Sequence, residues 1–326
     1  METTEQTSGK QIDLLSVGPV SLDTNVSFDG KEEKNLGGAV IYGGWAAAQC
    51  GFKTVIVTTA NASECDVAEG FYGSGVTLTV LPSAHTCAIR NVYLSADKER
   101  RVSTNTHRAD PIRFSDIEDL ALTTRAIQLG GLVAGDFEED ILPKLHALKQ
   151  CYSDQAQTTP LGVITYPIIG IDAQGLLRTV EPDGSMRFHP WKAMETLLPF
   201  VDVLKTDAAE AEYLTGLSDR YEAAKALCDM GAREVMVTHN SEVIVCGHFG
   251  ARDLSFVKAP LVPRNLSGRT GRGDTTFAGY LAMRSTHTAQ EAVLFAAALV
   301  SKKMETPGPY HGSKDDILSY IHCFYD

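Results

Sequence analysis

The sequence has no apolar segment that is long enough to cross a bilayer. Its longest helical apolar run, from Ala292 to Val300, is far shorter than the roughly 20 residues that a membrane span needs. The first residues, METTEQTSGKQ, lack the basic start and the apolar centre of a secretory signal. We therefore expect residues 1–11 to be a polar, mobile lead-in and the protein to be cytoplasmic.

Positive charge and paired cysteines are also scarce. The formal net charge is −12 with a pI of about 5.2, which argues against nucleic acid and anionic membranes as general partners. A local nest of backbone amides can still bind a phosphate on an acidic protein. The cysteines number seven, none in a C-x-x-C spacing, so we expect reduced thiols in an intracellular protein.

Several nucleotide and metal motifs are missing. The chain has neither the phosphate-binding G-x-x-x-x-G-K-[ST] sequence nor an H-E-x-x-H pair. The first apolar strand continues as SVGPVSLD rather than G-x-G-x-x-G, which weakens a dinucleotide-binding oxidoreductase as an alternative. A tightly bound structural metal is not indicated.

What the chain does contain is an alternation of short apolar runs with helical patterns. This alternation predicts an α/β fold of the three-layer kind, with a mostly parallel central sheet and helices on both faces. One helix is expected to end just before Gly51, because glycine readily takes the left-handed conformation that follows a helix end. The expected strands lie at residues 12–20, 53–60, 126–135, 161–166, 201–206 and 234–240.

Two stretches interrupt this alternation. Residues 23–36 turn at Asp29-Gly30, and residues 85–105 contain two short alternating runs. Both patterns predict antiparallel ribbon. Because no Pro/Gly/Ser-rich linker divides the chain, we expect one domain over residues 12–326, with the ribbons inserted in it as a small β-lid above the carboxyl edge of the main sheet.

Helix-start signals appear at three places. Thr288 with Glu291 fits a capping box, and Asp207 with Glu210 fits an Asp-capped start. Asp274 precedes the run TTFAGYLAM and is expected to be the N-cap residue of that helix.

The segment GRTGRGDTTFAGYLA combines a glycine-rich turn with a helix start. Gly271 and Gly273 permit a sharp turn, so that the amides of Gly271, Arg272, Gly273 and Asp274 can converge on an anion at the helix N-terminus. A carboxylate beside a phosphate makes sense if it takes a proton from an attacking hydroxyl. The alternatives are a plain turn with Asp274 as a cap, or an adhesion signal, which a cytosolic location argues against.

At these residues the chain resembles the ribokinase-like (PfkB) carbohydrate kinases, whose C-terminal signature is T-G-A-G-D-[TS]-F-x-x-G. The resemblance implies a ribokinase-like fold, ATP and Mg²⁺ as cofactors, Asp274 as catalytic base and an anion hole over residues 271–274. The sequence departs from the signature at Arg272 and Thr276. It keeps Thr270, Gly271, Gly273, Asp274, Thr275 and Gly279.

The resemblance also implies substrate-binding residues near the start of the chain. Asp23, which closes VGPVSLD, matches the aspartate that binds sugar hydroxyls. Gly37 and Gly38 match a Gly-Gly motif that lets the sugar approach the backbone. Ala39 and Tyr42 stand where ribokinase carries lysine and asparagine, which disfavours ribose and favours a cyclitol or a sugar that stacks on Tyr42.

For the donor, the segment VLKTDAAEAEYLTG resembles the N-x-x-E motif, with Asp207 in place of the asparagine. Glu210 would then place Mg²⁺ indirectly, through water. Thr238 and Asn240 match the nucleotide-binding strand and loop, and Thr270 joins this set. Val243 stands where a glycine is usual, so we expect a reshaped nucleotide pocket.

These features together predict ATP-dependent phosphorylation of a hydroxyl on a sugar, cyclitol or nucleoside-like polyol. The alternative is a non-catalytic sensor of a sugar or nucleotide on the same fold. The replacements at Asp207 and Val243 favour the sensor, whereas Asp274 counts against it because a sensor needs no base. A homodimer that pairs through the lid is an alternative to a monomer; neither nucleic acid nor a membrane is an expected partner.

Overall fold

The computed structural model describes residues 11–95, 101–151, 157–159, 162–164, 167–250 and 253–325. Apart from Gln11, the predicted lead-in lies outside the described residues. Among the described helices, none has both the length and the apolar character needed to span a bilayer. All seven cysteines are free thiols.

The core of the protein is a nine-stranded sheet, which confirms the predicted α/β class. It is parallel from β5 to β15, and β16 and β17 continue it antiparallel at one edge. In spatial order, the strands are β17 (Ser255–Pro260), β16 (Glu242–Gly247), β15 (Glu234–Thr238), β14 (Val203–Asp207), β11 (Ile168–Asp172), β8 (Thr124–Leu129), β1 (Ile12–Val17), β4 (Thr54–Ala60) and β5 (Thr77–Pro82).

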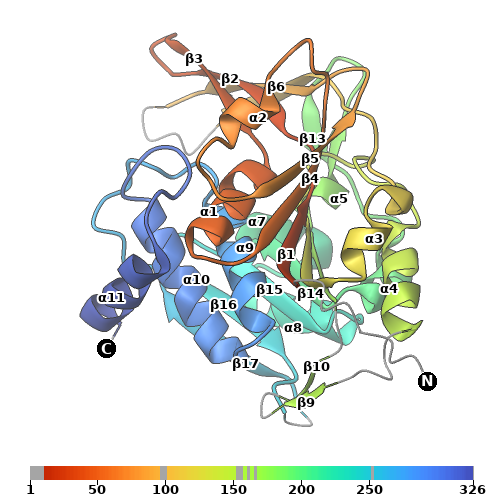
Figure 1. Cartoon of the computed structure of the whole chain (residues 1–326), viewed down its shortest axis with the longest axis vertical. Coiled ribbons are helices and arrows are strands. Elements are labelled where there is room, and N and C mark those ends of the chain that lie inside the picture. Colours follow the sequence, from red (N-terminus) through yellow and green to blue (C-terminus); the bar gives the residue numbers. More distant parts are fainter. Residues whose placement is uncertain are drawn as a thin grey trace, which may run out of the picture.

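Helices cover both faces of this sheet (Figure 1). The shorter elements are η1 (Val40–Gly44), α2 (Val67–Gly70), η2 (Phe114–Asp116), α5 (Gln174–Leu177), α6 (Met194–Leu197) and η4 (Leu198–Phe200). One face carries α3 (Glu118–Ala121), α4 (Ile141–Cys151), α7 (Ala208–Thr215) and α8 (Arg220–Asp229). The other face carries α1 (Trp45–Gln49), α9 (Arg272–Arg284), α10 (Ala289–Lys303) and α11 (Lys314–Phe324).

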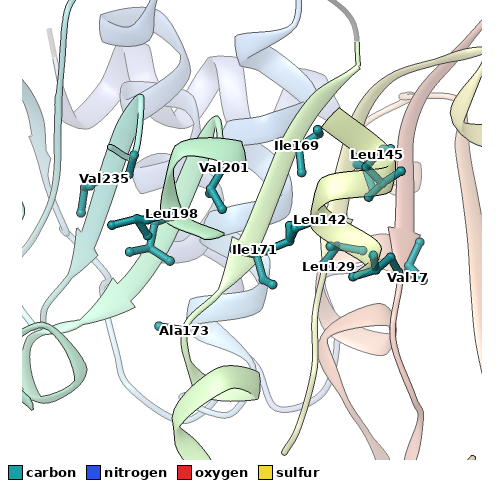
Figure 2. Packing of buried hydrophobic residues seen from close by; sticks show 14 of the residues in the cluster. Val17, Leu129, Leu142, Leu145, Ile169, Ile171, Ala173, Leu198, Val201 and Val235 are labelled. Atoms are coloured by element: carbon teal, nitrogen blue, oxygen red, sulfur yellow. The ribbon is translucent and has the colours of Figure 1, made fainter. Parts of the chain in front are cut away.

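Figure 2 shows how the first of these faces packs. Leu142 and Leu145 of α4 lie beside Val17, Leu129 and Ile171 of the sheet, and none of these side chains is more than 2% exposed. Burying each such side chain contributes about 1.5–3 kcal/mol. The parallel strands therefore form a rigid platform on which the loops at their carboxyl ends are mounted.

The two predicted ribbons form a separate four-stranded sheet, here called the lid sheet. Its strands, in spatial order, are β3 (Glu32–Gly37), β2 (Ser21–Val26), β6 (Cys87–Tyr93) and β7 (Arg101–His107). Because β2 follows β1 after three residues, the lid sheet stands above the carboxyl ends of the central strands, at the top of Figure 1. A bridge between Thr104 and Ser185 joins it to the hairpin of β12 (Arg178–Val180) and β13 (Met186–Phe188).

One predicted strand is wrong. The stretch 161–166 was expected in the central sheet, but its described part is β10 (Gly162–Ile164), which pairs antiparallel with β9 (Gln157–Thr159) outside that sheet. Residues 161, 165 and 166 lie outside the described part. The central position belongs to β11, whose five residues are all buried. Both stretches are short apolar runs, and only the neighbouring strands distinguish them.

Candidate active site

Asp274 lies one turn later in its helix than the sequence predicts. Helix α9 begins at Arg272, and its N-cap is Gly271 with φ 74°, so the prediction of Asp274 as N-cap is wrong. The left-handed glycine lets the chain enter the helix early. As a result the Asp274 carboxylate does not cap the helix, and among the described residues no group donates a hydrogen bond to it.

The Asp274 carboxyl is set up to exchange a proton near neutral pH. Burial, with a smaller effect of the nearby Asp172 carboxylate, raises its pKa from 3.8 to about 6, against the opposing charges of Lys205, Lys303 and Arg178. A general base works best when its pKa is close to the working pH.

Gly271 is required by its contacts and its backbone conformation, and Gly273 lies close to a lysine side chain. A Cβ on Gly271 would collide with the ring of Tyr42, and its positive φ is strained for other residues. A Cβ on Gly273 would lie 3.2 Å from Lys205 Nζ. The turn is therefore held tightly between the Tyr42 ring and the Lys205 ammonium.

The first amides of α9 are available to an anion. Thr275 N donates to Gly271 O at 3.0 Å, which is the first full helical bond. The amides of Gly273 and Asp274 come before it and have no backbone acceptor in the described part of the chain. Free amides and the helix dipole together favour a phosphate at this point.

Lys205, which the sequence analysis did not single out, lies at the centre of the site. Its ammonium is 2.9 Å from Asp172 Oδ2 and 3.9 Å from Glu210 Oε2, and the side chain is buried. Burial opposes its charge, but the carboxylates of Asp172 and Glu210 raise its pKa. The signal available in the sequence was a lysine inside the predicted strand VDVLKT.

Asp207 and Glu210 form the predicted capping box at the start of α7. Glu210 N donates to Asp207 Oδ1 at 2.8 Å, and Asp207 N donates to Glu210 Oε2 at 2.7 Å. Burial raises the pKa of Glu210. Within the described ranges no group of three or more His, Cys, Asp or Glu is placed to hold a metal.

On the acceptor side, Asp23 carries an unsatisfied carboxylate oxygen. Its Oδ1 is buried without a hydrogen-bond partner among the described residues. Burial raises its pKa to about 6, although Ser21, Arg101 and Arg178 act in the opposite direction. A Cβ on Gly37 would lie 2.8 Å from Asp23 Cγ, and Gly38 has φ 107°. The Gly-Gly motif therefore leaves space around this carboxylate.

The Tyr42 side chain lies near both the acceptor carboxylate, Asp23, and the proposed base, Asp274. It lies in η1 and is 8% exposed. Burial and the charges of Asp23 and Asp274 raise its pKa to about 12, so both carboxylates are near it. The structure thus brings Asp23, Tyr42 and Asp274 together from β2, η1 and α9. The ring face that packs on Gly271 is covered by protein and is not open for a sugar to stack on.

Arg178 is a second residue that the sequence analysis missed. It begins β12, beyond the carboxyl end of β11, and is partly exposed. Burial and the neighbouring charge of Arg101 lower its pKa, while Glu210, Asp172 and Asp207 raise it. No motif identifies this arginine, because the hairpin reaches the site only through the fold.

In the predicted nucleotide loop, the side chains of Asn240 and Thr238 already form hydrogen bonds within the protein. Asn240 Oδ1 accepts a hydrogen bond from Arg272 Nη1 and another, at 3.2 Å, from Arg269 Nη2. Thr238 Oγ1 donates to Thr206 O inside the sheet at 3.3 Å. Val243, expected at a loop glycine position, is a buried residue of β16 paired with Thr238. The Arg272 side chain therefore points to this loop.

Comparisons with known proteins identify a family and similar solved structures. The sequence family described as pfkB family carbohydrate kinase matches residues 177–316. A solved pyrophosphate-dependent kinase in the ribokinase family, complexed with a pyrophosphate analogue and myo-inositol, is 31% identical, with TM-score 0.78 over 94% of this chain and 99% of that one. A pyrophosphate-dependent myo-inositol-1 kinase converted into a myo-inositol-3 kinase is 30% identical, with TM-score 0.78 over 96% and 100%.

A more distant structure shares the fold alone. The ribokinase of Arabidopsis thaliana, complexed with ribose and ATP, is 16% identical, with TM-score 0.68 over 94% of this chain and 98% of that one. No curated protein matches the sequence.

Proposed function

The chain belongs to the pfkB family of carbohydrate kinases, and from that premise we propose that it transfers a phosphoryl group from pyrophosphate to a ring hydroxyl of a cyclitol such as myo-inositol. The observation that carries this proposal is the Asp274 carboxylate, which lies half-buried at the first turn of α9 and has a pKa raised to about 6 by burial. It lies beside the first backbone amides of α9, and the Tyr42 side chain feels the charges of both Asp274 and Asp23.

In the proposed reaction, separate groups bind the acceptor, hold the transferred phosphate and accept the proton. Asp23 Oδ1 accepts hydrogen bonds from the acceptor's hydroxyls. The amides of Gly273 and Asp274, with the Lys205 ammonium beneath them, hold the phosphate being transferred. The acceptor oxygen attacks phosphorus, its proton passes to Asp274, and the bond from phosphorus to the bridging oxygen breaks. Mg²⁺, when bound with the donor, would neutralise phosphate oxygens.

Two features support pyrophosphate as the donor. The relatives at 31% and 30% identity are described as pyrophosphate-dependent, whereas the ATP-bound ribokinase is 16% identical. Within the chain, Arg269 and Arg272 meet at Asn240. Guanidinium groups match the geometry of phosphate oxygens. ATP, the donor that the sequence predicts, is the second candidate.

A cyclitol acceptor is supported by the acceptor pocket and by the same relatives. Asp23 is placed to bind neighbouring hydroxyls, and Ala39 and Tyr42 replace the polar pair of ribokinase. The relative crystallised with myo-inositol aligns over nearly its whole length.

The experiment is a matrix of donors and acceptors. Purified protein is incubated with Mg²⁺ and pyrophosphate, ATP or tripolyphosphate, against cyclitols, pentoses, hexoses and nucleosides. The phosphorylated product is detected by ³¹P NMR. We expect turnover with pyrophosphate and a cyclitol.

Each alternative donor, acceptor or function would give a different pattern of turnover in these assays. Turnover with ATP but not with pyrophosphate would overturn the donor. Turnover with a pentose or a nucleoside but no cyclitol would overturn the acceptor. Binding of donor and acceptor without any product would indicate the non-catalytic sensor.

A further inference from the structure

Lys303 is the one lysine of the last turn of α10 that is completely buried. Its side chain is 0% exposed, among the largest fully buried side chains of the described chain. A buried lysine is normally paired with a carboxylate, yet no ion pair of Lys303 occurs among the described residues. Burial lowers its pKa to about 8, and the charge of Asp274 partly restores it.

The Lys303 ammonium instead binds backbone carbonyls of the anion-binding turn. Nζ donates to Gly268 O at 2.7 Å and to Thr270 O. It also lies 5.1 Å from the centre of the Tyr42 ring, close enough for a cation–π interaction. Two carbonyl oxygens and a ring face thus enclose one positive charge.

The same helix end holds the turn at other points. Gly268 N donates to Met304 O at 2.8 Å, and Ser267 Oγ donates to Glu305 O at 2.7 Å. Gly271, directly after Thr270, packs on the Tyr42 ring and begins α9. Moving the Lys303 ammonium would therefore move the turn whose amides face the donor.

We infer that Lys303 is a positioning residue for phosphoryl transfer: its ammonium fixes the carbonyls of Gly268 and Thr270, and so the amides of the turn, in the arrangement that binds the donor phosphates. The inference rests on the proposal that this turn binds the donor. The positive charge matters for two reasons: a charged donor makes stronger hydrogen bonds to carbonyls, and the charge acts on the anion nearby.

The chain offers a matched control at the next residue. Lys302 also lies near a tyrosine ring, 5.7 Å from the centre of Tyr320, but its ammonium pairs with Glu305 at 3.0 Å and the side chain is 31% exposed. Lys302→Met removes a lysine from the same helical turn without touching residues 268–271. It controls for any general loss of stability in α10.

The test compares Lys303→Met, Lys303→Gln and Lys302→Met. Lys303→Gln keeps a hydrogen-bond donor and removes the charge. We expect both Lys303 variants to raise the donor KM about 10- to 100-fold, the effect of losing hydrogen bonds from a charged group, with the acceptor KM changed less than about threefold. Lys302→Met should match wild type in both constants.

Chemical rescue supplies a readout that a purely structural role would not move. Ammonium or methylammonium ions at tens of millimolar should restore part of the activity of Lys303→Met, because the carbonyls of Gly268 and Thr270 still attract a small cation. Sodium chloride at the same ionic strength should restore none. Thermal unfolding of each variant checks that the protein is folded.

Direct binding keeps the test independent of turnover. Methylenediphosphonate and a non-hydrolysable ATP analogue are titrated calorimetrically into wild type and variants. Weaker binding of either ligand to folded Lys303→Met, with rescue by ammonium, supports the inference, even if no acceptor is found. An unchanged Kd and donor KM in folded Lys303→Gln, or equal effects of the Lys302 and Lys303 variants, would overturn it.

Discussion

The two ends of the central sheet bury charged side chains in opposite ways. At the amino end, Glu234 accepts hydrogen bonds from Tyr280 and from Arg284 Nε and Nη2 at 2.5, 3.0 and 2.8 Å. At the carboxyl end, Asp23 Oδ1 has no hydrogen-bond partner among the described residues and Asp274 accepts no hydrogen bond. Glu234 at the amino end thus serves the fold, whereas the carboxylates of Asp23 and Asp274 at the carboxyl end are open to a ligand.

A buried lysine at each end is paired with carboxylates. Lys149 at the amino end binds Asp202 through both carboxylate oxygens at 2.6 Å. Lys205 at the carboxyl end is shared between Asp172 and Glu210 and touches the glycine turn. Ligands of parallel α/β sheets bind outside the carboxyl ends of the strands. The carboxylates of Asp23 and Asp274 therefore lie at the edge of the sheet where a bound substrate can form hydrogen bonds with them.

The largest expected effect is on chemistry. Asp274→Asn keeps the shape of the site and removes the proton acceptor. Turnover should fall ~10²–10⁴-fold, the range for loss of a general base, while donor binding stays nearly intact. Steady-state kinetics with calorimetric donor titration measures both; near-normal turnover would remove Asp274 from the reaction.

At the opposite end of the sheet, Arg284→Met should affect stability instead. It leaves Glu234 buried without its cation, which costs about 3–5 kcal/mol. Denaturant unfolding should show this loss, and turnover per folded molecule should equal that of wild type. If turnover per folded molecule fell together with the stability, the two ends of the sheet would not be independent.

The acceptor side should respond more moderately. Asp23→Ala removes the carboxylate that we propose binds the hydroxyls, and each lost charge-assisted contact should cost about 1.5–3 kcal/mol. The acceptor KM should rise strongly while the donor KM changes little. Equal damage to both constants would make Asp23 a structural residue.

The smallest expected effect concerns Arg272. Its guanidinium bonds Asn240 at the donor loop, so Arg272→Ala should weaken donor binding about tenfold or less, the size of one hydrogen bond. Arg272→Lys should restore part of it, because an ammonium keeps the charge but not the planar fork. Donor affinity at low and moderate salt measures this. Identical affinities of all three proteins would place Arg272 outside the site.

The sequence predicted most of the architecture because its signals are local. Alternating apolar runs gave the sheet and its covering helices, and Thr288 with Glu291 forms the predicted capping box. The errors have local causes too. Gly271 starts α9 before Asp274, and residues 162–164 resemble a buried strand as closely as Ile168–Asp172 does.

The site was predicted only where a motif carries it. Asp23, Gly271 and Asp274 lie in recognisable segments, whereas Lys205, Arg178 and Lys303 join them through topology. The sequence does contain one signal for Lys303: at helical spacing it follows Ala292, Ala296 and Leu299 on the buried face of its helix. A lysine in such a series indicates a buried charge, but not what it binds.

The most direct test of the contrast between the two ends is the free energy of unfolding of Asp274→Asn without ligands. The Asp274 pKa is raised from 3.8 to about 6 in the folded protein, so ionisation above pH 6 destabilises the fold and protonation on acidification restores that stability. At pH 7 the neutral asparagine should be more stable than wild type by about 1–3 kcal/mol, and the gain should shrink toward pH 4. A variant that is less stable than wild type at pH 7 would contradict the claim that this carboxylate is kept for function at the expense of the fold.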